Sequence, residues 1–246
     1  MFAPQGPSLR ELAVQALSSV EHGYDLLAPK FDRTPFRTPR ALLDPVARAL
    51  LRSGPAGSGL DLCCGTGAGA GVLRRVCTDR AVGVDFSAGM LEVARAAAEE
   101  QAEAGGPREE WVRGDARALP FAAGSFDLVV SFGAFGHFLP RERPGLFEQV
   151  RRVLRPGGRF AFPVLAPPRA GSPLAWSLLA FDAAMRVRNA VWRPPFVMYY
   201  RSFRLTEVRD ELTRAGFGVE LAGLPELGGL PDGSPRCCLV TATRLR

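Results

Sequence analysis

The sequence predicts an α/β fold: a doubly wound, mostly parallel sheet of seven strands, the last one antiparallel, with a helical cap. Three observations predict it. Apolar, strand-like runs alternate with helix-like segments along residues 59–165. A glycine-rich turn from Gly65 to Gly69 directly follows the first of these runs. Asp85 ends the second run, 20 residues after Gly65, where an acid can hold a ribose diol.

Two helices are expected before the first strand. Ser8 and Glu11 form a capping-box pattern at the start of an apolar stripe, which predicts a helix over 8–21. A second stripe predicts a helix over 41–52. A Pro- and Arg-rich connection from Pro29 to Arg40 separates the two.

The core elements follow in alternating order. We expect strands over 59–64, 81–85, 110–114, 126–132 and 159–165, and helices over 68–76, 88–104 and around 146–154. Pro156-Gly157-Gly158 predicts a turn that stops the last of these helices. Such alternation predicts parallel strands with helices on both faces.

Residues 166–204 interrupt this alternation, and within them 174–191 suit a helix between two Pro-Pro pairs. A helix over 206–215 and strands over 217–223 and 237–243 follow, and a hairpin-like loop allows these strands to pair antiparallel. We therefore divide the chain into an N-terminal helical lid (1–52), a core (53–165), a cap insertion (166–204) and the closing elements of the core (205–246).

The composition argues against several classes of protein. With 47% hydrophobic and 23% charged residues, the chain can bury a full core. The net charge is +6, but the basic residues are scattered, so we expect no nucleic-acid partner. The five cysteines and two histidines show no metal-ligand spacing, so no metal is expected. An odd cysteine count without a signal pattern favours a cytoplasmic protein. The sequence contains no run of ~18 apolar residues, so we expect no membrane span.

Additional motifs separate the possible ligands of the glycine turn, which by itself also fits a dinucleotide. Asp61 precedes Gly65 by four residues, Gly114-Asp115-Ala116 follows the third strand, and Leu154 to Gly158 precedes the fifth. In this order the set resembles the class I S-adenosylmethionine-dependent methyltransferases, closest to the small-molecule branch that includes quinone-ring methyltransferases. The resemblance covers 59–165 closely and the two closing strands loosely.

This resemblance implies a Rossmann-like fold, S-adenosyl-L-methionine as cofactor, and roles for several acids. Asp61 would orient the ammonium group of the cofactor, and Asp85 would hold its ribose hydroxyls. Asp115 would accept from the adenine amino group, and the Ala116 amide would meet the ring nitrogen. The other implied cofactor-binding residues lie in the glycine turn, at the strand ends and in the N-terminal lid: Tyr24, Gly65, Thr66, Gly67, Phe86, Met90, Ser131 and Phe132.

The methyl acceptor is expected to be a small apolar or aromatic molecule. The cap insertion is rich in aromatic side chains that suit such a ligand: Trp176, Phe181, Trp192, Phe196, Tyr199 and Tyr200. His137, after the fourth strand, is the candidate catalytic base. A loop histidine bonded to the backbone is the alternative interpretation.

Other functions fit less well. A nicotinamide oxidoreductase often uses a Tyr with a nearby Lys, and the only lysine, Lys30, precedes the first strand. Nucleic-acid amino methyltransferases place Asn/Asp-Pro-Pro-aromatic after the fourth strand, where this chain has Ser131 to Ala134. A protein that binds the cofactor without transferring its methyl group stays open, because no base is clearly marked.

Overall fold

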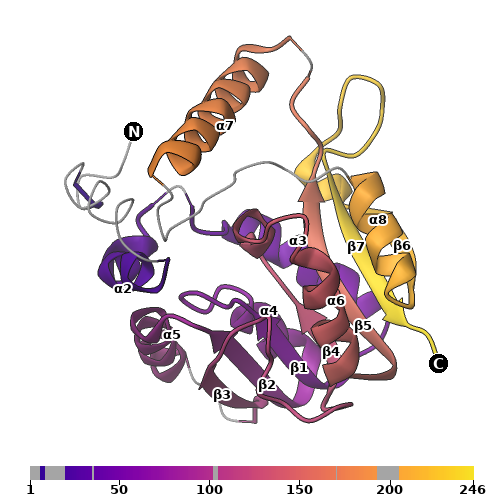
Figure 1. The fold of residues 1–246 in the computed structure, drawn as a ribbon. Coiled ribbons are helices and arrows are strands. Elements are labelled where there is room, and N and C mark those ends of the chain that lie inside the picture. Colours follow the sequence, from indigo (N-terminus) through magenta and orange to yellow (C-terminus); the bar gives the residue numbers. More distant parts are fainter. Residues whose placement is uncertain (1–5, 9–19, 35, 102–104, 170, 193–204) are drawn as a thin grey trace.

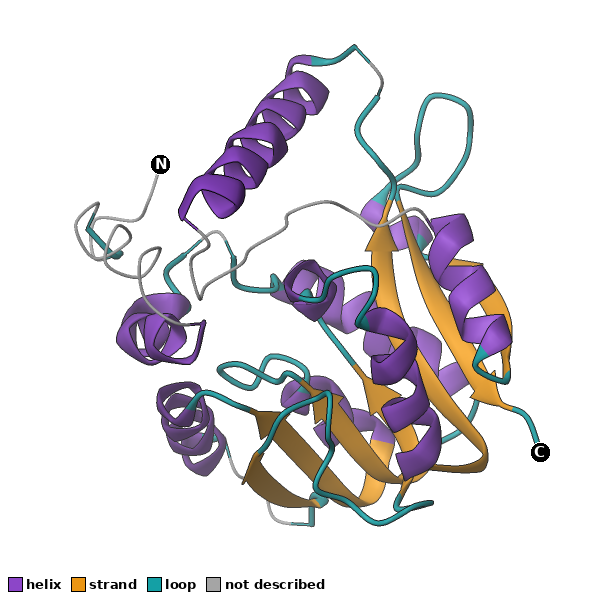
Figure 2. Cartoon of the chain, viewed as in Figure 1, coloured by secondary structure: helices purple, strands orange, loops and turns teal. Residues whose placement is uncertain are grey.

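The computed structural model describes residues 6–8, 20–34, 36–101, 105–169, 171–192 and 205–246. One twisted sheet carries helices on both faces, and a long helix projects from one end of the molecule (Figures 1 and 2). Most of the helix predicted over 8–21, and the aromatic residues Phe196, Tyr199 and Tyr200, lie outside the described residues. In the part that the structure describes, no helix is long and apolar enough to cross a membrane.

The sheet has seven strands in the order β3-β2-β1-β4-β5-β7-β6. They are β1 (Ala56–Leu62), β2 (Cys77–Asp85), β3 (Arg108–Arg113), β4 (Phe126–Val130), β5 (Leu154–Leu165), β6 (Phe217–Gly223) and β7 (Cys237–Arg244). Strands β1 to β5 pair in parallel, and β7 is antiparallel to both β5 and β6. This confirms the predicted fold class. The strand order reverses between β1 and β4, where open sheets of this kind bind ligands.

Two apolar clusters, one on each face, hold the helices to the sheet. These helices are α3 (Arg40–Arg52), α4 (Ala70–Val76), α6 (Arg143–Val153) and α8 (Leu205–Arg214), while α5 (Ala88–Glu100) packs against β2 and β3. Successive residues of β4 alternate between the clusters, with Phe126 and Val129 in one and Leu128 and Val130 in the other. Because both faces are covered, β4 is apolar at every position except Asp127.

The N-terminal part differs from the prediction. Helix α2 (Val20–Phe31) extends past the predicted end of the first helix and includes Pro29, which was expected to begin a connection. Pro29 lies near the end of α2, where it removes a single backbone hydrogen bond from the helix. Strands β2 and β5 also begin earlier than predicted. Pro156 to Gly158 lie within the irregular start of β5, where Gly157 has φ +80°, and helix α6 ends before them at Val153.

The predicted helix of the cap insertion is present as α7 (Pro173–Trp192). In Figure 1 it projects from the end of the molecule at which β5 finishes. Several of its apolar side chains are exposed: Trp176, Leu178, Leu179, Val187 and Val191.

Candidate active site

A cavity of about 900 Å³ lies at the carboxyl ends of the parallel strands. Residues after β1, β2, β3 and β4 line it, together with α2 and the segment that follows α2. All but two of the predicted site residues contribute to its wall: Tyr24, Asp61, Gly65, Thr66, Asp85, Phe86, Met90, Asp115, Ala116, Phe132 and His137. The structure thus gathers residues from five separate segments around one space.

The turn after β1 begins in a left-handed backbone conformation, with φ +57° at Cys63 and +52° at Gly65. The Gly65 N–H donates to Asp85 Oδ2 at 2.9 Å, which joins the turn to the end of β2. A Cβ at Gly65 would meet nothing within 4 Å, so the backbone is open on that side.

Two predicted residues do not line the cavity. A Cβ at Gly67 would lie 3.0 Å from the Trp111 ring, so this glycine permits close packing against β3. Ser131 donates its hydroxyl to the Leu62 carbonyl at 3.0 Å and its N–H to the Ala161 carbonyl at 3.2 Å. Both residues therefore shape the ends of the strands and do not form the wall of the cavity.

Asp61, on β1, is a buried acid that lacks a full set of partners. Its side chain is 1% exposed, and Oδ2 has no hydrogen-bond partner among the described residues. Burial, and next the charge of Asp85, raise the pKa of Asp61 to about 8, although backbone N–H groups of Ala70 and Gly69 lower it in part. A Cβ on Gly69 would lie 2.5 Å from this carboxylate. A cationic group is the partner that such an acid lacks.

Asp85 is also buried, but it accepts from two backbone N–H groups. The Ser87 N–H donates to Oδ1 at 3.0 Å, and the Gly65 N–H donates to Oδ2. Burial raises the pKa of Asp85, and these donors offset part of the rise. Each oxygen keeps a lone pair that can accept from a hydroxyl group.

Helix α2 and the residue that follows it are bonded to two of the loops that line the cavity. Asp25 Oδ1 accepts from the Ser87 hydroxyl at 2.6 Å and from the Gly89 N–H at 2.9 Å, at the start of α5. Asp32, just after α2, accepts from the Thr66 hydroxyl at 2.6 Å. No pattern in the sequence marked Asp32 for this contact.

Tyr24 of α2 reaches a third loop, the one that follows β4. Its Oη lies 2.8 Å from His137 Nε2, and the two rings meet edge to face with centroids 5.5 Å apart. His137 ends the short helix η1 (Ala134–His137). Burial lowers the pKa of His137 to about 4, so the ring is neutral at pH 7. Its Nδ1 has no partner among the described residues, which contradicts the alternative of a histidine bonded to the backbone.

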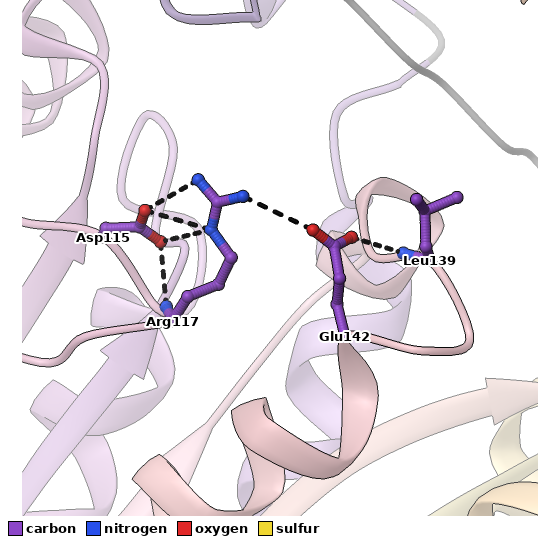
Figure 3. Close-up of polar contacts among 4 residues, drawn as sticks. All are labelled: Asp115, Arg117, Leu139 and Glu142. Carbon is purple, nitrogen blue, oxygen red and sulfur yellow. Dashed lines mark hydrogen bonds and ion pairs between the residues drawn. The ribbon is translucent and has the colours of Figure 1, made fainter.

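Asp115, after β3, is paired with Arg117 (Figure 3). The guanidinium Nη2 donates to Asp115 Oδ2 at 2.8 Å, and Nη1 lies 3.4 Å from Glu142 Oε1. Arg117 keeps the pKa of Asp115 below its usual value. Arg117 and Glu142 both line the cavity, and sequence reasoning missed both.

Part of the cavity wall is apolar. Sequence reasoning also missed these lining residues, which come from α2, the connection after it and the end of η1: Leu27, Phe31, Phe36 and Phe138.

A family model described as "Methyltransferase domain" matches residues 60–158. A 2-phytyl-1,4-naphtoquinone methyltransferase of Synechococcus elongatus is 33% identical over 168 residues, which are 66% of this chain and 70% of the relative. The chain belongs to the class I S-adenosylmethionine-dependent methyltransferases. The family uses S-adenosyl-L-methionine as methyl donor, which confirms the predicted cofactor.

Other relatives align with less than half of this chain. The demethylmenaquinone methyltransferase of Lactococcus lactis is 41% identical over 105 residues, which are 41% of this chain and 38% of the relative. That of Thermus thermophilus is 39% identical over 114 residues, 46% of this chain and 49% of the relative. The chain therefore spans less than half the length of these relatives.

Solved structures with little sequence identity share the fold. The PH0226 protein of Pyrococcus horikoshii has a TM-score of 0.58 at 22% identity, covering 87% of this chain and 95% of its own. The [4+2]-cyclase SpnF has a TM-score of 0.62 at 16% identity, covering 93% and 97%. These likenesses show the fold alone, and SpnF shows that the fold also serves another reaction.

Proposed function

We propose that this chain transfers a methyl group from S-adenosyl-L-methionine to a small, flat, mainly apolar acceptor, with both molecules in the cavity described above. The observation that carries the proposal is the buried carboxylate of Asp61, whose unpartnered oxygen shares one cavity with Asp85 and His137. When bound, the cofactor supplies an activated methyl group on a positively charged sulfur.

The acids suit the parts of this cofactor. Asp61 would take the ammonium group, because a cation restores the partner that its buried carboxylate lacks. Asp85 would accept from the ribose diol, and the open backbone at Gly65 would allow close approach. Asp115 would accept from the adenine amino group, and Phe86 would flank the adenine ring.

The acceptor would occupy the apolar side of the cavity, against Phe31, Phe36 and Phe138. Relatives described as naphthoquinone and menaquinone methyltransferases make a reduced naphthoquinone ring the first acceptor to test. They align with only 41% and 66% of this chain, so a panel of quinols and phenols is the appropriate assay.

His137 and Tyr24 would act on the acceptor. A neutral imidazole can take the proton that the acceptor loses as its new bond to the methyl group forms, and the proton then passes to solvent. Tyr24 would hold the ring by accepting from Nε2–H, which leaves Nδ1 as the nitrogen that takes the proton. Enclosure by the lid would keep water away from the methyl group.

The division into lid (1–52), core (53–165), cap (166–204) and closing elements (205–246) forms part of this proposal. Hydrogen bonds from Tyr24, Asp25 and Asp32 to the cofactor loops support a lid. The exposed apolar side chains of α7 supply apolar surface beyond what the sheet core requires, which supports a cap. Hydrogen exchange with and without S-adenosylhomocysteine should show slower exchange in both segments, and unchanged exchange over 166–192 would argue against a cap.

Two measurements test the function. Isothermal titration calorimetry should show micromolar binding of S-adenosylhomocysteine, and NAD should not compete. Mass spectrometry of the acceptor panel with S-adenosyl-L-methionine should then detect a product heavier by one methylene. Binding without methylation of any acceptor would favour a cofactor-binding protein, and tight NAD binding alone would sink the proposal.

A further inference from the structure

Arg117 occupies the carboxylate that the proposed function assigns to adenine. Its backbone N–H donates to Asp115 Oδ1 at 2.8 Å. Its Nε lies 3.1 Å from Oδ1 and 3.0 Å from Oδ2, and its Nη2 lies 2.8 Å from Oδ2. A carboxylate offers about four acceptor positions. Three N–H groups of Arg117 therefore occupy most of the acceptor positions of Asp115, and the single Nε hydrogen is shared between both oxygens.

A second acid lies within reach of the same guanidinium. Glu142 Oε1 is 3.4 Å from Arg117 Nη1, and the other oxygen of Glu142 accepts from the Leu139 N–H at 2.8 Å (Figure 3). The Leu139 contact fixes Glu142 just before α6. Arg117 thus bridges two acids from separate loops, and all three side chains line the cavity.

We propose that Arg117 competes with the adenine amino group for Asp115 and moves toward Glu142 when the cofactor binds. This inference rests on the proposed function, in which Asp115 receives the adenine. The exposed fractions are 59% for the Arg117 side chain and 45% for Asp115, so breaking their pair costs little in water. Glu142 is 27% exposed and gives the displaced guanidinium a second partner.

The competition makes Arg117 a specificity-determining residue for the nucleobase. An amino group donates to Asp115 and displaces the guanidinium. A carbonyl group at the same ring position cannot donate to Asp115, and it would accept from Arg117 instead. Arg117 should therefore weaken the binding of adenine ligands and favour their hypoxanthine counterparts.

Calorimetry on purified variants tests this. Arg117→Ala should bind S-adenosylhomocysteine about two- to five-fold more tightly, the size of effect that exposed ion pairs have. It should bind S-inosylhomocysteine no more tightly than the unmodified protein does. Glu142→Gln should weaken S-adenosylhomocysteine binding, because Arg117 loses its second partner, and this effect should vanish when Arg117 is also alanine.

Arg113→Ala is the matched control. Arg113 also lines the cavity, and its Nε donates to the Phe86 carbonyl at 3.1 Å. The Arg113→Ala variant loses the same positive charge as Arg117→Ala. An equal gain in S-adenosylhomocysteine affinity in both variants would therefore overturn the inference in favour of a general charge effect. Unchanged or weaker binding in a folded Arg117→Ala protein would overturn it too. A failure of the unmodified protein to bind S-adenosylhomocysteine would instead count against the proposed function.

Discussion

Asp61 should couple cofactor binding to pH. Burial and the nearby charge of Asp85 raise the pKa of Asp61 to about 8, so at pH 7 the carboxyl group of the free protein is mostly protonated. An ammonium group binds well only to the ionised form. Binding of S-adenosylhomocysteine near neutral pH should therefore release a proton from Asp61.

The size of the effect follows from that pKa. With a pKa of about 8, the ionised fraction is about 1% at pH 6, about 9% at pH 7 and about half at pH 8. Affinity for S-adenosylhomocysteine should then rise roughly fifty-fold from pH 6 to pH 8.

Calorimetry across this range, in two buffers with different ionisation enthalpies, measures both the affinity and the number of protons released. Asp61→Asn should bind weakly with no such rise. 5′-Methylthioadenosine, which lacks the amino-acid part, should show no rise with the unmodified protein. An affinity for S-adenosylhomocysteine that stays flat from pH 6 to 8, or the same rise for both ligands, would refute the assignment of Asp61 to the ammonium group.

The same pKa affects the stability of the free protein. The folded-state pKa of Asp61 lies above its unfolded value, so its contribution to stability is fully present below pH 3.8 and is lost as the pH rises through about 8. The free protein should therefore gain melting temperature from Asp61→Asn at pH 9. A lower melting temperature of this variant at pH 9 would show that the ionised carboxylate is well compensated.

Three further predictions test other parts of the site. Asp85→Ala should weaken S-adenosylhomocysteine binding tens-fold or more, about 2–4 kcal/mol for two lost hydrogen bonds, in a protein whose circular dichroism is unchanged; unchanged affinity would make this acid structural. His137→Gln should lower kcat by about 10²–10⁴ while leaving cofactor affinity intact, as expected of a lost base; equal turnover would leave the imidazole a packing role. Gly69→Ala should impair binding because its Cβ would lie 2.5 Å from the Asp61 carboxylate, whereas Gly71→Ala, two residues on in α4 and with nothing within 4 Å, should bind normally. Calorimetry on both glycine variants decides this, and equal affinities would mean that Asp61 adjusts without cost.

The succession of strands along the chain and the three acids at their ends could be predicted because those signals are local. Apolar runs, a glycine turn and an acid at a fixed spacing specify where the backbone turns. The spacing does not specify which way each residue faces. Gly67 and Ser131 fit the motif, yet the first packs on Trp111 and the second bonds to neighbouring strands.

The contacts of α2 and the segment after it with the loops of the sheet could not be predicted for a different reason. Asp32 and Thr66 are 34 positions apart, and Tyr24 and His137 are 113 apart. Their pairing depends on how α2 lies across the finished sheet, and contacts of that kind leave no periodic pattern in the sequence. Phe31 and Phe36 reach the cavity by the same route, from a stretch that reads as a connection.

The charges of Asp61 and Asp85 argue against a dinucleotide in this cavity. A dinucleotide would place its pyrophosphate at the glycine turn, beside the start of the following helix. Here that position adjoins Asp61, which already lacks a partner, and Asp85 contributes to the raised pKa of Asp61. A further anion would raise that pKa again and would itself be repelled. A ligand with a cationic group at the same point relieves both acids, which is the charge pattern of S-adenosyl-L-methionine and the opposite of that of NAD.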